Sequence, residues 1–196
     1  MRCRVALPLV CQRALAVVST LLVFFSGNAC RHVSPLEDEE ARWEECAGGI
    51  RDPATGLCWQ DPPAGPMSWW DASDYCLQQD IEELKFWRLP LVEELRSLIR
   101  GCGATEPGGD CPIDNFGSSA DLTDACSGCA GLEGPGPAGC YWPEELGEAC
   151  EGWYWTNSNL DGTSMHVWVV SYESATVDYL YKIQHESNVR CVQDSF

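Results

Sequence analysis

Thirteen cysteines constrain this chain of 196 residues more than any other feature. Two of them lie in the first 25 residues, a third is Cys30, and ten more are spread from Cys46 to Cys191. An even number of cysteines in a chain rich in turn residues predicts a disulfide framework. Disulfides persist in oxidising compartments, so we expect the residues after Cys30 to lie outside the cytoplasm.

The first 29 residues have the layout of a secretory signal peptide. Arginines at positions 2, 4 and 13 precede an apolar run from Ala14 to Phe25, and small residues follow. The run is too short to span a bilayer comfortably, and no second apolar stretch of spanning length follows it. The prediction is an exported chain whose residues 1–29 are removed.

The end of this leader resembles the lipobox of bacterial lipoproteins, in which the cysteine is acylated and becomes the mature N-terminus. The matching segment runs from Phe25 to Cys30, and it departs from the pattern at Gly27, where leucine is usual. The resemblance implies lipidation of Cys30 and an anchor in the bacterial cell envelope, in the periplasm or at the outer membrane or cell surface. The alternative is ordinary cleavage near Ala29. Removing Cys30 leaves the even count that a disulfide framework needs.

Charge limits the partners of the mature chain. Residues 30–45 form an acidic stretch, with Glu37 to Glu40 all acidic, which we interpret as a tether. Removing three leader arginines from 12 basic residues leaves 9 against 30 acidic ones, a net charge of −21 over 167 residues. Such a domain should repel nucleic acid and anionic membrane surfaces. We expect one domain over residues 46–196.

Before residue 102 the sequence predicts a hairpin, two helices and a short strand. Ser68 followed by Asp71 has the spacing of a capping box. Pro90 at one end and Gly101 at the other are typical of helix boundaries. The expected elements are a hairpin between Cys46 and Cys58, a helix over residues 69–79, a strand over 86–89, and a helix from Pro90 to about Arg100.

Residues 102–150 differ in kind and are interpreted as an insertion. Of these 49 residues, 10 are Gly, 5 are Pro and 6 are Cys. A long segment of this composition has little regular structure of its own and needs cross-links to become ordered. The six cysteines can supply up to three bridges of about 2–4 kcal/mol each.

After Gly152 the apolar residues recur with a period of two, which is typical of strands. Four strands are expected, over residues 153–158, 165–172, 175–183 and 189–192, with Asp161-Gly162 as a turn between the first two. Two helices, an insertion and then an antiparallel sheet predict the α+β class.

Several short phrases occur in an order that resembles a known family. They are Thr55-Gly56-Leu57-Cys58-Trp59-Gln60, Trp69 to Cys76, Trp87-Arg88-Leu89-Pro90 with Glu93-Glu94-Leu95, Tyr154-Trp155-Thr156 and Val189-Arg190-Cys191-Val192. Together they are similar to the bacterial exported domains related to the C-terminal domain of a Legionella collagen-like protein, the DUF1566 family. The resemblance covers about residues 46–193, apart from much of the insertion. It implies a variant of the C-type lectin-like fold with two helices, an antiparallel sheet and a disulfide-rich insertion.

The resemblance also implies a disulfide from the first helix to the last strand, which here is Cys76 with Cys191. Cys46 with Cys58 would close the N-terminal hairpin. The family gives no firm pairing for the six insertion cysteines, and 15 arrangements remain open. Proximity along the chain favours Cys102 with Cys111, Cys140 with Cys150, and Cys126 with Cys129.

A lectin-like fold raises the expectation of a ligand, either a glycan or an envelope protein. Sugar rings stack on aromatic faces, which makes Tyr141, Trp142, Trp153 and Tyr154 candidate binding residues, although large rings in strands usually belong to the core. Calcium-dependent lectins need oxygen ligands that Glu106-Pro107-Gly108 and Trp155-Thr156-Asn157 do not preserve. The only candidate metal ligands are Asp110, Asp114, Asp121 and Asp124, which we interpret mainly as solvated loop acids. No cofactor is expected.

Signatures of an enzyme are weak in this sequence. It contains neither a Gly-x-Ser-x-Gly elbow nor a His-Glu-x-x-His motif. The formylglycine-generating enzymes are distant relatives of the resembled family, so the alternative function is an exported oxidase or thiol-redox enzyme, with Cys126-x-x-Cys129 as its redox pair. In an oxidising compartment the disulfide interpretation is favoured. We expect no catalytic residues and a noncatalytic role.

Overall fold

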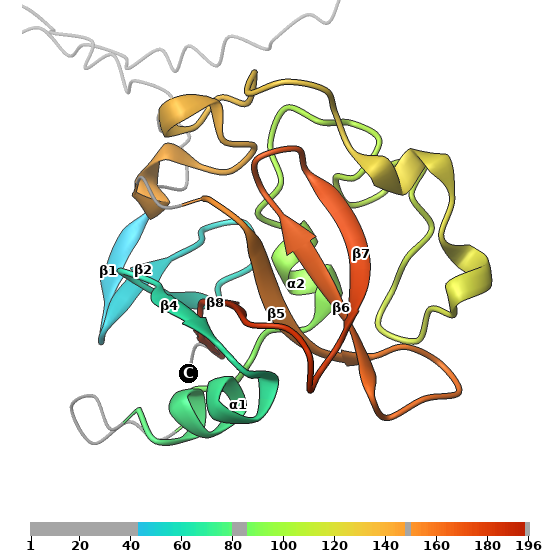
Figure 1. Cartoon of the computed structure of the whole chain (residues 1–196). Coiled ribbons are helices and arrows are strands. Elements are labelled where there is room, and N and C mark those ends of the chain that lie inside the picture. The colour runs from blue at the N-terminus through green and yellow to red at the C-terminus, as the bar shows by residue number, and fades with distance from the viewer. Residues whose placement is uncertain (1–42, 80–85, 148–149, 195–196) are drawn as a thin grey trace, which may run out of the picture. The chain divides into compact units, whose positions relative to one another are not determined.

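The computed structural model describes residues 43–79, 86–147 and 150–194 (Figure 1). The expected signal peptide, Cys30 and most of the tether lie outside these residues. No helix within the described ranges combines the length and apolar character needed to cross a bilayer.

The smaller of two sheets brings the first and last strands of the domain together. Its order is β1 (Glu44–Cys46), β2 (Gly49–Arg51), β3 (Cys58–Gln60) and β9 (Val192–Gln193), and all neighbours are antiparallel. The expected hairpin between Cys46 and Cys58 is therefore part of a three-stranded meander, which the C-terminal segment completes.

The larger sheet has five strands in the order β4-β8-β5-β6-β7. They are β4 (Ala64–Met67), β5 (Trp153–Asn159), β6 (His166–Ser171), β7 (Thr176–Tyr181) and β8 (Ser187–Val189). Its pairs are antiparallel except β5 with β8, so the sheet is mixed. With the two helices, it confirms the α+β class.

Both expected helices are present, and the second is shorter than expected. In α1 (Trp69–Leu77) the Ser68 side chain accepts a hydrogen bond from the backbone N–H of Asp71, so the N-cap forms as predicted. Helix α2 (Val92–Arg96) ends early because Arg96 turns into the interior and the Arg100 N–H donates to the carbonyl of Tyr141. The expected strand over residues 86–89 is reduced to one bridge, between Arg88 and Val192.

Strands β5 and β6 are covered on both faces, which explains the unbroken apolar run Val167 to Val170. Trp155, Val167 and Val169 pack with α1 residues such as Trp69 and Cys76 in one core. The alternate residues face the other way and join a second core with α2 and the insertion; these are Tyr154, Trp168 and Val170. The insertion thus supplies a layer of core and is more than a surface loop.

The insertion runs over the top and down the right side of the view in Figure 1. Its only regular elements among the described residues are short 3-10 turns, at Ser119–Asp121, Asp124–Ser127, Pro137–Gly139 and Glu144–Leu146. Order comes instead from Arg96, which is buried and donates hydrogen bonds to the backbone carbonyls of four insertion residues. These are Thr105, Glu106, Cys111 and Ile113. One side chain thereby satisfies carbonyls that no sheet or helix satisfies.

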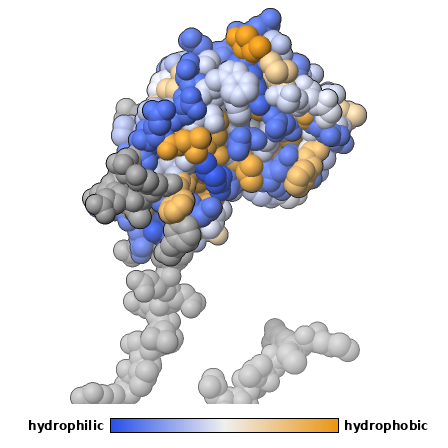
Figure 2. All heavy atoms as spheres, turned by 90° about the horizontal axis from the view of Figure 1, so that it is seen from below, coloured by the Kyte–Doolittle hydropathy of each residue, from blue (hydrophilic) through white to orange (hydrophobic). Residues whose placement is uncertain are grey.

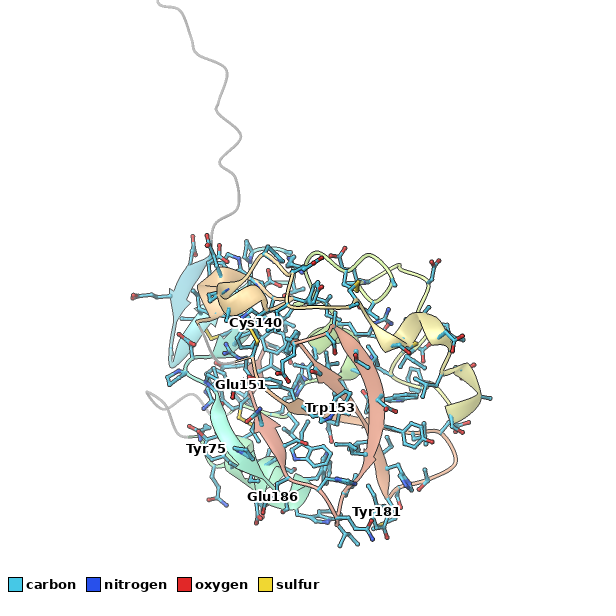
Figure 3. The ribbon with its side chains drawn as sticks, turned by 45° about the horizontal axis from the view of Figure 1, so that its top comes forward. Tyr75, Cys140, Glu151, Trp153, Tyr181 and Glu186 are labelled. Atoms are coloured by element: carbon cyan, nitrogen blue, oxygen red, sulfur yellow. A yellow bond between two sulfur atoms is a disulfide. The ribbon has the colours of Figure 1, made fainter. Side chains whose placement is uncertain are left out.

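Five disulfides cross-link the domain. The structure joins Cys46 to Cys58, Cys76 to Cys191 and Cys140 to Cys150, the pairs expected from the resemblance and from proximity. The last of these brings the end of the insertion to the start of β5, so that Cys140 and Glu151 lie next to each other in Figure 3.

Two of the expected pairings, Cys102 with Cys111 and Cys126 with Cys129, are wrong. The structure joins Cys102 to Cys129 and Cys111 to Cys126, so one bridge is nested inside the other. The reason lies in the backbone around Gly128 and in what packs against it. Gly128, at φ +76°, reverses the chain between Cys126 and Cys129, and a side chain at Gly128 would collide with the carbonyl of Ser174.

Candidate functional site

The expected aromatic platform is wrong for three of its four residues. Tyr141 is 2% exposed, Trp142 is 0% and Tyr154 is 1%, so none presents a face to a ligand. The Trp142 ring centroid lies 5.9 Å from that of Tyr154 and 5.2 Å from that of Tyr172. These rings pack as core aromatics do. Only Trp153, at the start of β5 in Figure 3, is partly exposed.

A buried arginine stands beside this aromatic cluster. The Arg190 guanidinium carbon lies 4.8 Å from the centre of the Trp142 ring, and Nη2 donates to the carbonyl of Leu146 at 2.9 Å. Its Nη1 is 3.7 Å from Asp61 Oδ1. Burial lowers the pKa of Arg190, and burial also raises the pKa of Tyr154 to about 12, with Arg190 opposing that shift. This arginine fixes the end of the insertion, so its role is structural.

The four candidate aspartates do not form a cation site. Across the described ranges, no three His, Cys, Asp or Glu side chains gather as a metal-binding group. Two of the aspartates instead build turns: Asp114 Oδ1 accepts from the Phe116 N–H at 2.8 Å, and Asp121 Oδ2 accepts from the N–H and hydroxyl of Ser118. The hydrogen bonds from Ser118 lower the pKa of Asp121.

A hollow of about 520 Å³ opens where β5 ends, and we call it the asparagine hollow. This volume falls within the range of about 300–1,000 Å³ that is usual for small-ligand sites. Three segments of the chain meet there. They are the start of α2 with Leu91, the insertion with Asn115 and Phe116, and residues 157–164, which include Asn157, Asn159, Asp161 and Ser164.

Phe116 is the most exposed large apolar side chain that the structure describes, at 85%. It sits at the tip of a turn in which the Gly117 N–H donates to the carbonyl of Asp114 at 3.2 Å. The carbonyl of Gly117 in turn accepts from the Asp161 N–H at 3.0 Å, which ties the turn to the far side of the hollow. The ring is therefore held in water by a fixed backbone, a placement that contributes nothing to the core.

The amide side chains of the hollow have unequal roles. Asn115 is fully engaged, since its Oδ1 accepts from the Ser158 hydroxyl and the Glu93 N–H, and its Nδ2 donates to Glu93. By contrast, among the described residues the side chains of Asn157 and Asp161 have no hydrogen-bond partner. Both residues are exposed at the surface.

Asn159 is oriented by a buried lysine. Lys182 Nζ donates to Asn159 Oδ1 at 2.9 Å, and the same ammonium lies 3.6 Å from the centre of the Trp69 ring. An aromatic face stabilises a cation of this kind. This bond uses one lone pair of the Asn159 oxygen, so the second lone pair and the Nδ2 hydrogens remain to the amide. Burial lowers the pKa of Lys182.

A larger hollow, of about 670 Å³, lies between β4 and the segment before β5. Its walls include the Pro63-Ala64-Gly65-Pro66 run, and its polar groups are largely used within the protein. The Asn188 amide donates to the carbonyl of Glu151, and the Gly152 N–H donates to the Glu173 carboxylate at 2.9 Å. The asparagine hollow offers more unpaired polar groups, so we assign it as the candidate site.

Sequence reasoning missed Phe116, Asn157, Asn159 and Asp161. One signal was present: asparagines two apart at a strand end lie on the same side of the strand. Asparagine is also depleted in strands, so a pair of them there indicates a role other than strand formation.

Fold and site define the class of this protein as an α+β domain, stapled by five disulfides, with a small polar site at the surface. The comparisons name the family. A family model matches residues 48–193, and the chain belongs to the Lcl C-terminal domain family. The comparison with curated protein sequences found no match.

The motifs that carry the resemblance have structural roles. Arg88 donates to both carboxylate oxygens of Glu94 at 2.7 Å, which raises the Arg88 pKa above its usual value, and its backbone pairs with Val192. Trp87 and Trp155 are buried in the core beside α1. The family motifs therefore specify the scaffold, and the asparagine hollow is built beside them.

Proposed function

We propose that this protein is an exported envelope lipoprotein, anchored through Cys30, whose domain is a lectin-like module for noncatalytic ligand binding. The ligand is a glycan or an envelope protein, and the domain presents it with the asparagine hollow. Support for export comes from the five disulfides, because such bridges persist in oxidising compartments.

The observation that carries the proposal is the combination of an exposed ring and unpaired polar groups on a rigid frame. Phe116 is fixed by its turn, and Asn157 and Asp161 lie beside it in the same hollow. Ligand sites typically join an apolar surface to a few placed polar groups. Elsewhere the surface seen from below is largely hydrophilic, with apolar residues in separate spots (Figure 2).

The rival function is thiol-redox or oxidase chemistry. It requires Cys126 and Cys129 to exchange electrons as a pair, whereas each of them is engaged in a different bridge. Counting free thiols in the protein purified from the periplasm decides between the two functions. None is expected from the ten domain cysteines, and a reactive Cys126–Cys129 pair would support the rival.

Binding is tested with the full chain expressed with its leader and purified in mild detergent. The probes are an array of neutral, acidic and sulfated glycans, and a set of purified outer-membrane proteins. At least one probe should bind the wild type and be lost on Phe116→Ala, with the melting temperature unchanged. If no probe binds, the proposal of ligand binding is overturned and a purely architectural role is left.

The anchor is tested by feeding cells with labelled palmitate. The label should appear on the wild type and on Cys11→Ala, whose substitution lies within the leader, and it should vanish on Cys30→Ala. Label retained on Cys30→Ala would refute the anchor without affecting the ligand site.

A further inference from the structure

The asparagine hollow has a chemistry that selects one class of ligand. It joins an exposed aromatic face, neutral amides and the Asp161 carboxylate, which has no hydrogen-bond partner in the described part of the chain, and the buried Lys182 ammonium donates to one of the amides. From this combination we propose that the hollow binds a neutral pyranoside sugar and that it does so without a calcium ion. The inference rests on the proposed function and makes its ligand specific.

The first step is the ring of Phe116. A pyranose has one face of C–H groups, which is apolar, and an edge of hydroxyls, which is polar. The Phe116 ring, which is 85% exposed, can stack on the apolar face of the sugar. Removing the ring from water on binding then contributes favourable free energy to the complex. Peptide ligands also bury aromatic rings, so the ring alone does not decide the class.

The second step is the set of polar groups that line the hollow together with the ring. A sugar hydroxyl both donates and accepts, and a side-chain amide can satisfy both roles at once. Asn157 has a complete unpaired amide. Asn159 has its Nδ2 donors and one lone pair of Oδ1 left, because Lys182 donates a single hydrogen bond to that oxygen at 2.9 Å. With the Asp161 carboxylate as a pure acceptor, the hollow offers the mixed donors and acceptors that adjacent hydroxyls require.

Charge excludes the anionic sugars. The whole chain has a net charge of −18, and Asp161 lines the hollow itself. The negative potential of the domain would repel sulfated sugars and uronic acids. Arg96, which interacts with Glu93 and Asp114, directs its guanidinium to insertion carbonyls. Lys182 is buried, lies over the Trp69 ring and directs its ammonium to Asn159. It orients the amide and is not presented as an anion-binding group.

The same lysine excludes calcium. A calcium ion needs six to eight oxygen ligands. The Asn159 oxygen accepts from an ammonium, and the Asn115 oxygen accepts from Ser158 and Glu93. A dication placed here would also sit close to the positive charge of Lys182. The sugar must therefore be held by protein groups alone.

The test measures the affinity of the full chain in mild detergent for methyl pyranosides of glucose, galactose, mannose and N-acetylglucosamine by saturation-transfer NMR. Each titration is run in EDTA and again in calcium, and glucuronic acid and a sulfated galactose serve as anionic probes. We expect at least one neutral pyranoside to bind equally in both buffers, and more tightly than either anion.

Variants then place the binding in the hollow. Phe116→Ala should weaken the neutral sugar about tenfold, and Asn157→Ala should weaken it at least severalfold. Leu132→Ala is the matched control, because Leu132 is another exposed apolar residue of the insertion and does not line the hollow. It should leave affinity unchanged.

A calcium requirement, a preference for the anionic sugars, or full affinity in Phe116→Ala would each overturn the inference. If neutral sugars fail while another probe of the array binds and is lost on Phe116→Ala, the inference falls and the proposed function stands. If no probe binds at all, both fall.

Discussion

Arg96 is the side chain on which the order of the insertion depends most, and Arg96→Met tests this. Methionine keeps most of the aliphatic volume and removes the guanidinium, which donates to four backbone carbonyls. Those of Thr105, Cys111 and Ile113 are buried. Each buried carbonyl left unpaired costs about 1–3 kcal/mol, and the desolvation cost of the guanidinium that disappears offsets part of the total.

The net loss should be about 3 kcal/mol of unfolding free energy, equivalent to a fall of roughly 6–12 °C in melting temperature for a domain of this size. The assay is denaturant unfolding with the disulfides intact, joined to hydrogen exchange of the amides from 102 to 113. Arg100→Met is the matched control, because among the described residues the Arg100 side chain donates only to the carbonyls of Ser97 and Ile99 near the helix end, and its backbone bond to Tyr141 is kept. It should cost less than about 1 kcal/mol. Equal losses in the two variants would refute the organising role of Arg96.

Three further predictions follow from single contacts. Burial raises the Tyr154 pKa from 10.0 to about 12, so its stabilising contribution is complete below pH 10 and about 2–3 kcal/mol is lost as the pH rises to 12. Unfolding curves from pH 8 to 11 should show this slope, and Tyr154→Phe should make it shallower without abolishing it, because burial also raises the pKa of Tyr172. Replacing both Cys111 and Cys126 by alanine opens a bridge spanning 15 residues and should cost about 3 kcal/mol, whereas a Cys126–Cys129 peptide in a non-reduced digest would contradict the observed pairing. Ser68→Ala removes the N-cap of α1 and should cost about 1 kcal/mol in thermal unfolding; no measurable change would show that Asp71 caps the helix by itself.

Local patterns predicted the elements well wherever the decisive interactions are local. The start of α1 follows from Ser68 and its hydrogen bond to Asp71. Strands β5, β6 and β7 follow from their period of two and the turn at Gly162, which adopts φ +77°. These features depend on residues a few positions apart, so a single sequence contains the information.

Predictions failed where the interior is built by distant residues. Arg96 has the position of an exposed charge at a helix end, and only the folded insertion shows that its carbonyls need that donor. The nested cysteine pairs depend on the course of the chain through Gly128 and on the carbonyl of Ser174 behind it. Trp142, in a loop rich in glycine and proline, gives no sign in sequence that Tyr154 and Tyr172 will enclose it.

The residues of the candidate site were also not predicted, because they come together only in the folded chain. Aromatic residues were expected to mark the site, and three of the four, Tyr141, Trp142 and Tyr154, are buried in the core. The ring that reaches solvent, Phe116, has no other candidate site residue near it in the sequence. It comes close to residues 157–164 only in the folded chain, where the Asp161 N–H donates to the carbonyl of Gly117. A site assembled from three separate segments leaves only weak traces in each of them.

The small sheet has a consequence for how the domain can be used in evolution. Its outer strands, β1 and β9, belong to the two ends of the domain and are separated by only two strands, a span of roughly 14 Å. The N-terminal and C-terminal ends of the domain are therefore close together, and the Cys76–Cys191 disulfide fixes the C-terminal end to α1. A module with adjoining ends can be appended to a longer protein or spliced into a loop of an unrelated host with little distortion of either partner.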